Sequence, residues 1–238
     1  MRIAVVIFAR MDSSRLPGKV LANLGGEPLL HHVVARARRS GEDVIIATST
    51  RLLDEPIVTL AHSLGLRCYR GDAEDVLGRA FACGLGMRLD AVIRISGDSP
   101  FIDPCLIMRV TEVFRANCGI DIATNVFPRT YPLGLSVEVI SVDALAKANA
   151  ATVDKAEREH VTRFFYNNSN SFRIVNCSAE TAHDLELRLT VDEASDLDRA
   201  RWMIEAGAGL DAPLEKVLGL AAAYRDLVST PHSKQPTA

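Results

Sequence analysis

The sequence predicts an α/β fold in which a largely parallel sheet is covered by helices on both faces. Short apolar runs of strand length alternate with segments of helical period through the first half of the chain. These runs are continuously apolar, which is typical of parallel strands buried on both faces. With 238 residues, 48% of them hydrophobic, the chain can form one large domain with three layers and right-handed crossovers.

The elements of the first half follow one another in a regular order. Residues 3–8, IAVVIF, form the first apolar run, and a polar loop with a Pro-Gly turn follows over 9–19. Pro28 begins a helix whose apolar residues recur at helical spacing, and Gly41 ends it. The same alternation predicts strands over 44–47, 66–69, 91–95 and 120–123 and helices over 54–64, 73–87 and 104–116.

The alternation ends after Thr124. We expect a loop over 125–135, a short strand over 136–140 and a largely helical segment over 142–166, and 125–166 together are expected to form an inserted lobe or a dimerisation arm. Two strands over 172–177 and 187–191 and two helices over 194–206 and 214–227 complete the fold. Residues 1–228 are therefore predicted to be a single domain, and the polar tail 229–238 is predicted to be disordered.

Composition and charge exclude several classes of protein. Lys and Arg total 27 and Asp and Glu total 30, a net charge of −3, whereas binding to nucleic acid or an anionic membrane needs a basic surplus. The five cysteines are scattered without a CxxC pair, which indicates reduced thiols. The apolar start is too short for a membrane span or a signal peptide. We therefore expect a cytoplasmic protein without a nucleic-acid or membrane partner.

The loop over 9–19 carries the strongest functional signal. It holds three cations, Arg10, Arg15 and Lys19, and two hydroxyl groups, on Ser13 and Ser14. It follows the first strand, and open α/β sheets bind ligands at the carboxyl ends of their strands. Cations beside small residues and exposed backbone N–H groups suit a polyphosphate, and a solvated surface loop is the alternative interpretation. The spacing matches neither a Walker A loop nor a G-x-G-x-x-G fingerprint.

The segment R-M-D-S-S-R-L-P-G-K-V-L at 10–21 resembles the signature loop of the cytidylyltransferases that activate acidic sugars. These include the acylneuraminate and 3-deoxy-manno-octulosonate enzymes, and the spore-coat polysaccharide (SpsF-like) type is the most similar. Further resemblances follow in order, at I-R-I-S-G-D-S-P-F-I-D-P (93–104), Y-P-L-G-L-S-V-E-V (131–139), E-R-E-H-V-T (157–162) and L-T-V-D (189–192). Together they cover nearly the whole chain and imply a Rossmann-like nucleotidyltransferase core of the nucleotide-diphospho-sugar transferase type.

The resemblance implies roles for the loop and for two strand ends. Arg10, Lys19, Asp98 and Asp192 are expected to be catalytic, with Mg²⁺ held by the two aspartates. Two strand-end carboxylates suit Mg²⁺, which binds one or two carboxylates together with waters and substrate phosphates. A turn cap at Asp98 and a helix N-cap at Asp192 are the structural alternatives. The implied nucleotide-binding residues are Ala9, Arg10, Ser13, Ser14, Arg15, Lys19, Ser49, Asp75, Arg79 and Asp98.

Three further groups of residues need interpretation. Asp12 stands where the family usually carries a small residue, and its carboxylate is unfavourable beside a triphosphate unless it contacts Arg15 or a metal. Asp196 and Asp198 form a D-x-D pattern, but they fall in the first turn of an expected helix, where acidic residues favour the dipole. An acidic acceptor needs cations and hydroxyl groups, for which the candidates are Arg129, Tyr131, Glu138, Arg158 and His160.

Structural alternatives stay open for several of these residues. His160 equally suits packing at a subunit interface, and Glu138 suits a pair with a nearby arginine. Asp75 and Arg79 are also consistent with a solvated helix face.

The activity implied is a Mg²⁺-dependent transfer of CMP from CTP to a small acidic sugar, with release of pyrophosphate, for a surface polysaccharide. A homodimer is expected, with 125–166 exchanging contacts between subunits. Two alternatives stay open: a nucleotidyltransferase that uses another NTP or another acceptor such as a phosphonate, and a nucleotide-binding homologue without catalysis. Acceptor pockets are built from variable loop side chains, so the sequence does not identify the acceptor.

Overall fold

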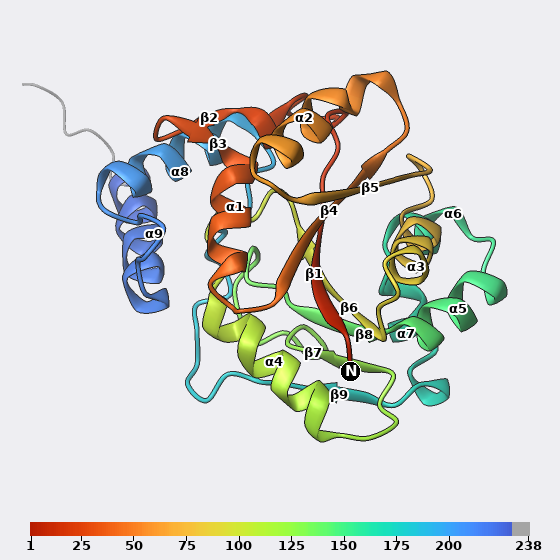
Figure 1. Ribbon diagram of the computed structural model, residues 1–238. Helices are drawn as coiled ribbons and strands as arrows, with labels where there is room; N and C mark the ends of the chain where they lie inside the picture. Colours follow the sequence, from red (N-terminus) through yellow and green to blue (C-terminus); the bar gives the residue numbers. More distant parts are fainter. Residues whose placement is uncertain (230–238) are drawn as a thin grey trace, which may run out of the picture.

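A computed structural model describes residues 1–229. Its centre is a seven-stranded sheet in the order β5-β4-β1-β6-β8-β7-β9 (Figure 1). Four strands, β1 (Ile3–Phe8), β4 (Asp43–Ser49), β5 (Arg67–Gly71) and β6 (Ala91–Ser96), pair in parallel. The predicted α/β fold with a parallel central sheet is therefore confirmed, and the carboxyl ends of β1 and β6 lie at the same edge.

The second half of the chain extends this sheet. β8 (Glu138–Ser141) lies between β6 and β7 (Ile122–Thr124) and is antiparallel to both, and β9 (Ile174–Asn176) pairs in parallel with β7. The segment 125–166 thus begins with a loop over 125–137, contributes β8 to the main sheet and ends in helices that lie beside α3 (Val76–Gly86). Its expected role in dimerisation stays a prediction.

Helices cover both faces of the sheet because the side chains of each strand alternate between two cores. In β1, Ile3, Val5 and Ile7 enter one core, whereas Ala4 and Val6 enter the other. The first core is covered by α1 (Leu29–Arg38), α2 (Glu55–Ser63) and α4 (Pro104–Ala116), and the second by α3 (Val76–Gly86), α5 (Val142–Ala151) and α7 (Arg163–Asn167). Figure 1 shows these groups on opposite sides of the sheet.

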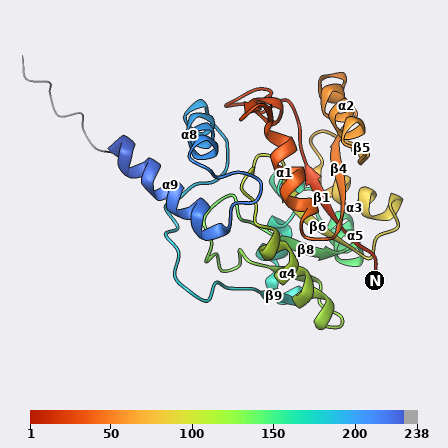
Figure 2. The same ribbon diagram turned by 60° about the vertical axis from the view of Figure 1, so that its left-hand side comes forward.

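The C-terminal helices form an outer pair. α8 (Ala194–Glu205) packs against α9 (Leu214–Ser229) and against a short hairpin of β2 (Asn23–Leu24) and β3 (Glu27–Pro28). Figure 2 shows α9 extending away from the sheet. The buried guanidinium of Arg36 fixes the loop between α8 and α9, because it donates hydrogen bonds to the carbonyl oxygens of Gly209, Leu210 and Ala212. Its Nε also donates to the carbonyl oxygen of Ile102, between β6 and α4.

Several sequence-based expectations need correction. The run 187–191 forms no strand, because its backbone bonds run to loops: Leu189 N–H donates to Leu133 O and Val191 N–H to Asp98 O. The expected long helix is broken twice: Thr152 and Asp154 separate α5 from α6 (Lys155–Glu159), and His160 and Thr162 separate α6 from α7. Single 3₁₀ turns occur at Lys19–Leu21, Leu52–Asp54 and Ser169–Ser171. The expected disordered tail lies outside the described residues, except Ser229, which ends α9.

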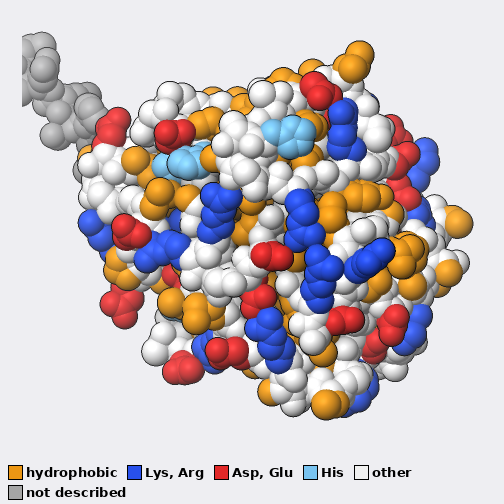
Figure 3. Space-filling model, in the orientation of Figure 1, with side chains coloured by type: hydrophobic (Ala, Val, Ile, Leu, Met, Phe, Trp, Pro, Cys, Tyr) orange, Lys and Arg blue, Asp and Glu red, His pale blue; other side chains and the backbone are white. Residues whose placement is uncertain are grey.

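The surface carries charges of both signs. Acidic and basic side chains are intermixed over the face that Figure 3 shows. Within residues 1–229, no helix is long and apolar enough to cross a membrane.

Candidate active site

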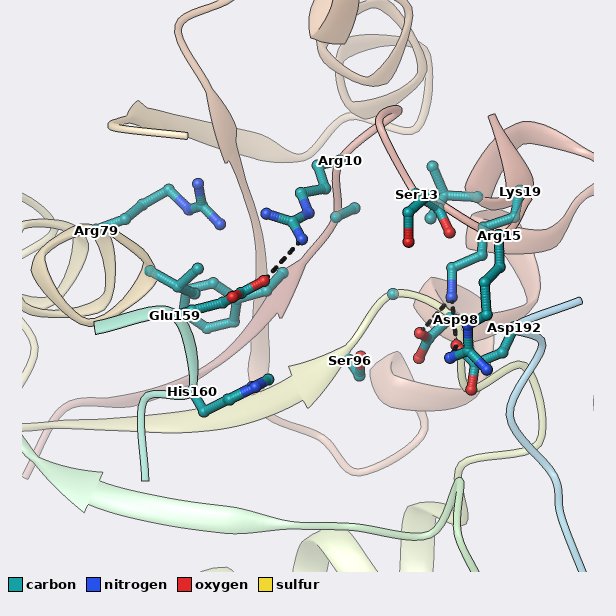
Figure 4. Close-up of a pocket in the computed structure, with 16 residues that line it drawn as sticks. Arg10, Ser13, Arg15, Lys19, Arg79, Ser96, Asp98, Glu159, His160 and Asp192 are labelled. Carbon is teal, nitrogen blue, oxygen red and sulfur yellow. Dashed lines mark hydrogen bonds and ion pairs between the residues drawn. The ribbon is translucent and has the colours of Figure 1, made fainter. Parts of the chain in front are cut away.

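A cavity of about 320 Å³ opens at the carboxyl ends of β1 and β6. This size falls within the range of small-molecule sites, about 300–1,000 Å³. Figure 4 shows loop cations on one side and residues of α6 and its C-terminal turn on the other. The residues that line the cavity are Phe8, Ala9, Arg10, Ser13, Ser14, Arg15, Lys19, Val20, Val76, Arg79, Ser96, Gly97, Asp98, Glu159, His160 and Asp192.

Backbone contacts close the loop over 9–19 on itself. Gly18 adopts a positive φ of 74°, which favours glycine, and its N–H donates to Met11 O at 2.8 Å. Lys19 then begins a 3₁₀ turn and is only 8% exposed. The loop thereby directs a nearly buried ammonium group into the cavity.

The Lys19 ammonium bridges two aspartates from distant parts of the chain. Its Nζ donates to Asp98 Oδ2 at 2.8 Å and to Asp192 Oδ1 at 2.9 Å. The segment that carries Asp192 is held there because Val191 N–H donates to Asp98 O at 2.9 Å. Burial raises the pKa of Asp192, but the hydrogen bond and charge of Lys19 outweigh it, and the net pKa is lowered.

Gly97 permits the close approach of the two strand ends. A Cβ on this residue would lie 2.9 Å from both Ala9 Cβ and the carbonyl oxygen of Phe8. The Gly97 N–H also donates to Phe8 O at 2.9 Å. The absence of a side chain at Gly97 therefore lets the backbone next to Asp98 pack directly against the end of β1.

The other two loop cations also face carboxylates. Arg15 lies 3.1 Å from Asp192 and 3.3 Å from Glu193, and Arg10 donates to Glu159 Oε1 at 3.1 Å. The dashed contacts in Figure 4 show that the Arg10 partner comes from the opposite wall of the cavity. All three cations of the loop are thus paired with carboxylates around one cavity, an arrangement that phosphate oxygens can replace.

Behind the loop, a buried polar network joins it to the end of β4. Asp54 is fully buried and accepts hydrogen bonds from Met11 N–H at 2.7 Å and from the Ser49 hydroxyl. Arg51 lies 2.6 Å from Asp12, so Asp12 contacts Arg51 and Arg10 rather than Arg15. Ser49 therefore lies behind the loop and does not line the cavity.

Arg79 lines the cavity as a nearly buried cation. Its Nη1 donates to Asp72 O at 2.6 Å, its guanidinium lies 5.8 Å from the Phe8 ring centre, and its buried Nε has no hydrogen-bond partner. Burial lowers the pKa of this guanidinium. An acceptor atom of a ligand would satisfy the unpaired Nε–H.

Asp75 serves as the N-cap of α3. Its Oδ1 accepts from Gly78 N–H at 2.8 Å, and its Oδ2 pairs with Arg158, which also donates to Asn149 and Thr152. Both residues line a neighbouring cavity that shares Arg10 and Glu159 with the first. Asp75 and Arg158 therefore tie α3 to α5 and α6.

Glu138 is 2% exposed and binds protein groups at both carboxylate oxygens. Oε1 accepts from the Tyr166 hydroxyl at 2.6 Å, and Oε2 pairs with Arg94 at 2.6 Å. Burial and the adjacent carboxylate raise the pKa of the Tyr166 phenol. The structure thus shows the pair with an arginine that the sequence analysis offered as the alternative for Glu138.

The remaining acceptor candidates lie at different places. His160 lines the cavity and points toward Ser96 (Figure 4). Tyr131 is 4% exposed and its hydroxyl contacts Arg109, while Arg129 donates to the Ser136 hydroxyl at 3.2 Å. Of the five candidates, the structure brings only His160 to this cavity within residues 1–229.

The donor set of the cavity fits one Mg²⁺ ion. Asp98 and Asp192 offer hard carboxylate oxygens on either side of a single nitrogen, and Mg²⁺ takes one or two carboxylates with phosphates and waters. Across the described chain, no cluster of three or more metal-binding side chains exists. Asp196 belongs to the capping box of α8, which agrees with the interpretation of the D-x-D pattern as helix capping.

Some residues of the site were not singled out by the sequence. Glu159 and Glu193 pair with loop cations that lie 149 and 178 residues away, and Arg51 and Asp54 support the loop from behind. Glu159 lies within the E-R-E-H-V-T segment, which was the one available signal. The partners themselves are fixed only by the fold.

The chain resembles a known protein family over most of its length. A model of the cytidylyltransferase family matches residues 4–220. The spore coat polysaccharide biosynthesis protein SpsF of Bacillus subtilis is 30% identical over 228 residues, 92% of this chain and 93% of that protein. A 3-deoxy-manno-octulosonate cytidylyltransferase of Trichlorobacter lovleyi is 32% identical over 128 residues, 52% of this chain and 49% of that enzyme.

Solved structures share the fold. A cytidylyltransferase from Leptospira borgpetersenii superposes with a TM-score of 0.91 at 25% identity and covers 99% of this chain and 100% of its own. A CMP:2-keto-3-deoxy-manno-octonic acid synthetase, solved with CTP, matches in fold with a TM-score of 0.66 at 18% identity, covering 87% of this chain and 99% of its own. The chain is a nucleotidyltransferase with a Rossmann-like core and belongs to the cytidylyltransferase family.

Proposed function

We propose that this enzyme transfers CMP from CTP to a small acidic sugar, depends on Mg²⁺ and acts in surface polysaccharide biosynthesis. The observation that carries the proposal is the Lys19 ammonium between Asp98 and Asp192, at the floor of a cavity ringed by loop cations. The names of two relatives support the substrate class: one belongs to spore coat polysaccharide biosynthesis, and one activates an acidic sugar with a cytidylyl group.

The loop binds the triphosphate in this proposal. Phosphate oxygens take the places that carboxylates hold on Arg10, Arg15 and Lys19, and the hydroxyl groups of Ser13 and Ser14 add donors from the same wall. Arginine binds phosphate with two parallel N–H groups, which gives geometric selectivity as well as energy. Arg79 supplies an unpaired Nε–H for an acceptor atom of the nucleotide.

Asp98 and Asp192 would hold the Mg²⁺ ion. When bound, the ion supplies charge neutralisation on phosphate oxygens and lowers the pKa of a coordinated hydroxyl. Lys19 leaves the aspartates and follows the phosphates. Its ammonium then lies on the leaving group, where it acts together with Arg10.

The proposed reaction is a displacement at phosphorus. A hydroxyl oxygen of the acceptor attacks the α-phosphorus of CTP and its proton passes to water. The bond from that phosphorus to the bridging oxygen breaks, and pyrophosphate leaves with the electron pair. Lys19 and Arg10 stabilise the charge that develops on the pyrophosphate. We assign recognition of the acceptor's carboxylate to His160, because it is the acceptor candidate that lines the cavity.

A thermal-shift panel with CTP, UTP, GTP and ATP, each with and without Mg²⁺, tests the nucleotide. Ligand at a hundredfold its Kd stabilises the folded state by about 2.7 kcal/mol, so selective stabilisation by CTP with Mg²⁺ is expected. A preference for another nucleotide would reassign the substrate. No response to any of the four would favour a homologue that has lost catalysis.

The acceptor requires a second assay. Pyrophosphate release is measured with CTP, Mg²⁺ and a series of acidic sugars, with a phosphonate and a neutral sugar as comparison acceptors. Release with an acidic sugar alone is the expected result. Release with the phosphonate alone would keep the mechanism and change the acceptor class.

We also propose a homodimer that uses the 125–166 segment. Two apolar side chains of this segment are exposed, Val153 at 93% and Phe127 at 39%. Sedimentation equilibrium should show twice the chain mass of 25.9 kDa, and Val153→Asp should shift the protein toward monomer. A monomeric wild-type protein would contradict the proposal.

A further inference from the structure

Asp12 is the one acidic residue of the loop over 9–19. Its Oδ2 lies 2.6 Å from Arg51 Nη1, and its Oδ1 lies 3.2 Å from Arg10 Nε. The hydrogen bond from Arg51 lowers the pKa of Asp12, so the carboxylate is charged at neutral pH. A full negative charge therefore lies within the loop that is expected to bind a triphosphate.

Arg51 fixes this carboxylate to the body of the protein. The Arg51 Nε also donates to the Ser49 hydroxyl at 3.2 Å, and its Nη2 lies 3.5 Å from Asp54. Asp54 in turn accepts the backbone N–H of Met11 at 2.7 Å. Two successive loop residues, one through its backbone and one through its side chain, are thus held by the connection between β4 and α2.

Arg10 has carboxylates on two sides. Asp12 lies at its Nε, whereas Glu159 accepts from its Nη2 at 3.1 Å and is 47% exposed. The Oδ1 atom of Asp12 is buried and has no aligned hydrogen bond, although Arg10 is close enough to supply one. A buried carboxylate oxygen without a donor is costly, so a small turn of Arg10 toward Asp12 is favourable once Glu159 is displaced.

We propose that Asp12, held by Arg51, is a positioning residue for Arg10. When a phosphate oxygen replaces Glu159, Arg10 directs its Nε–H onto Asp12 Oδ1 and presents its two Nη groups to the phosphate. The orientation of Arg10 outweighs the repulsion between Asp12 and the triphosphate. The identity of the nucleotide rests on the proposed function, whereas the effect on phosphate binding does not.

Two variants with the same charge change separate orientation from electrostatics. Asp12→Asn and Glu159→Gln each remove one carboxylate charge beside Arg10, so electrostatics alone would make both bind anions more tightly. If Asp12 positions Arg10, the two variants change anion affinity in opposite directions. Asp12→Asn weakens binding by about tenfold, the scale of one charge-assisted hydrogen bond, and Glu159→Gln tightens it. Calorimetric titration with CTP plus Mg²⁺ and with inorganic tripolyphosphate measures both.

Further readouts exclude a merely structural effect. In protein labelled with ¹⁵N-arginine, the Nε–H resonance of Arg10 should shift on addition of tripolyphosphate in wild type and Glu159→Gln but not in Asp12→Asn. Arg51→Met should weaken tripolyphosphate binding as Asp12→Asn does. The protein with both substitutions should bind no more weakly than Asp12→Asn alone, because both substitutions act through one contact. Asp43→Asn is the control, because it removes the partner of Arg67 at the opposite end of the strands. It should bind tripolyphosphate with wild-type affinity.

The outcomes are distinguishable. Asp12→Asn that binds tripolyphosphate as tightly as wild type, or more tightly, overturns the positioning role. Wild type that binds tripolyphosphate but not CTP contradicts the proposed nucleotide and leaves the positioning test intact. Wild type that binds neither overturns both.

Discussion

The ammonium of Lys19 lies 2.8 Å from Asp98 Oδ2, and the same nitrogen lies 2.9 Å from Asp192 Oδ1. Lys19 thereby occupies the space between the two carboxylates that would hold a divalent cation. A metal ion must displace the ammonium, and the displaced ammonium needs a new anion because its side chain is only 9% exposed. Metal and triphosphate are therefore expected to assist each other's binding.

The first prediction concerns this coupling. Mg²⁺ should tighten CTP binding by about tenfold or more in wild type, within the usual range of coupling between two ligands. Lys19→Met should bind Mg²⁺ alone more tightly than wild type, because the aspartates are freed, and should bind tripolyphosphate less tightly. Calorimetric titration of each ligand alone and together measures this. Unchanged Mg²⁺ affinity in Lys19→Met would contradict the interpretation that the Lys19 ammonium occupies the metal position between the two aspartates.

The second prediction concerns the aspartates. Asp98→Asn and Asp192→Asn should each lower kcat/KM by at least about 100-fold, because the charge of a metal ligand is lost. The amide keeps the shape of the side chain, so the melting temperature should stay within about 4 °C of wild type. Asp198→Asn, at a side chain that is 65% exposed on α8, is the matched control and should keep full activity. A variant that retains wild-type turnover would remove that aspartate from the metal site.

The third prediction follows from the lowered pKa of Asp192. Its ordinary value is 3.8, and the folded value lies below it. A carboxylate with a lowered folded pKa contributes stability above its unfolded pKa and loses it as the pH falls through the folded pKa. The stability difference between wild type and Asp192→Asn should therefore be constant at neutral pH and shrink below pH 3.8. Urea unfolding over a pH series measures it, and a difference that grows on acidification would be inconsistent with this sign.

The fourth prediction concerns Glu138. Glu138→Ala should lower the free energy of unfolding by about 3–5 kcal/mol, because it leaves Arg94 and the Tyr166 hydroxyl without their buried partner. Glu138→Gln should cost less, since it keeps an acceptor for one of them. Urea unfolding tests both, with Glu112→Ala on the exposed face of α4 as the control, expected within about 0.5 kcal/mol of wild type. A Glu138→Ala protein of full stability would point instead to a role confined to the acceptor.

Local sequence was sufficient for much of the fold. The run Ile3–Phe8 is apolar at every position, which requires burial on both faces, and the structure places it between β4 and β6. The strand over 187–191 was predicted wrongly because an apolar pattern reports burial and not its hydrogen-bond partners. Leu189 and Val191 are buried against loops, and their N–H groups donate to Leu133 and Asp98.

For the candidate site, the sequence by itself determined which residues carry charge and that the loop follows a buried strand. That was enough to place Arg10, Arg15 and Lys19 at the ligand-binding edge, because parallel strands end at a common edge. Only the tertiary structure decided their partners. Lys19 meets Asp98 and Asp192 at sequence separations of 79 and 173 residues, and Ser49 turns behind the loop to bind Asp54. Such contacts depend on strand order and chain crossing, which local patterns of polarity do not encode.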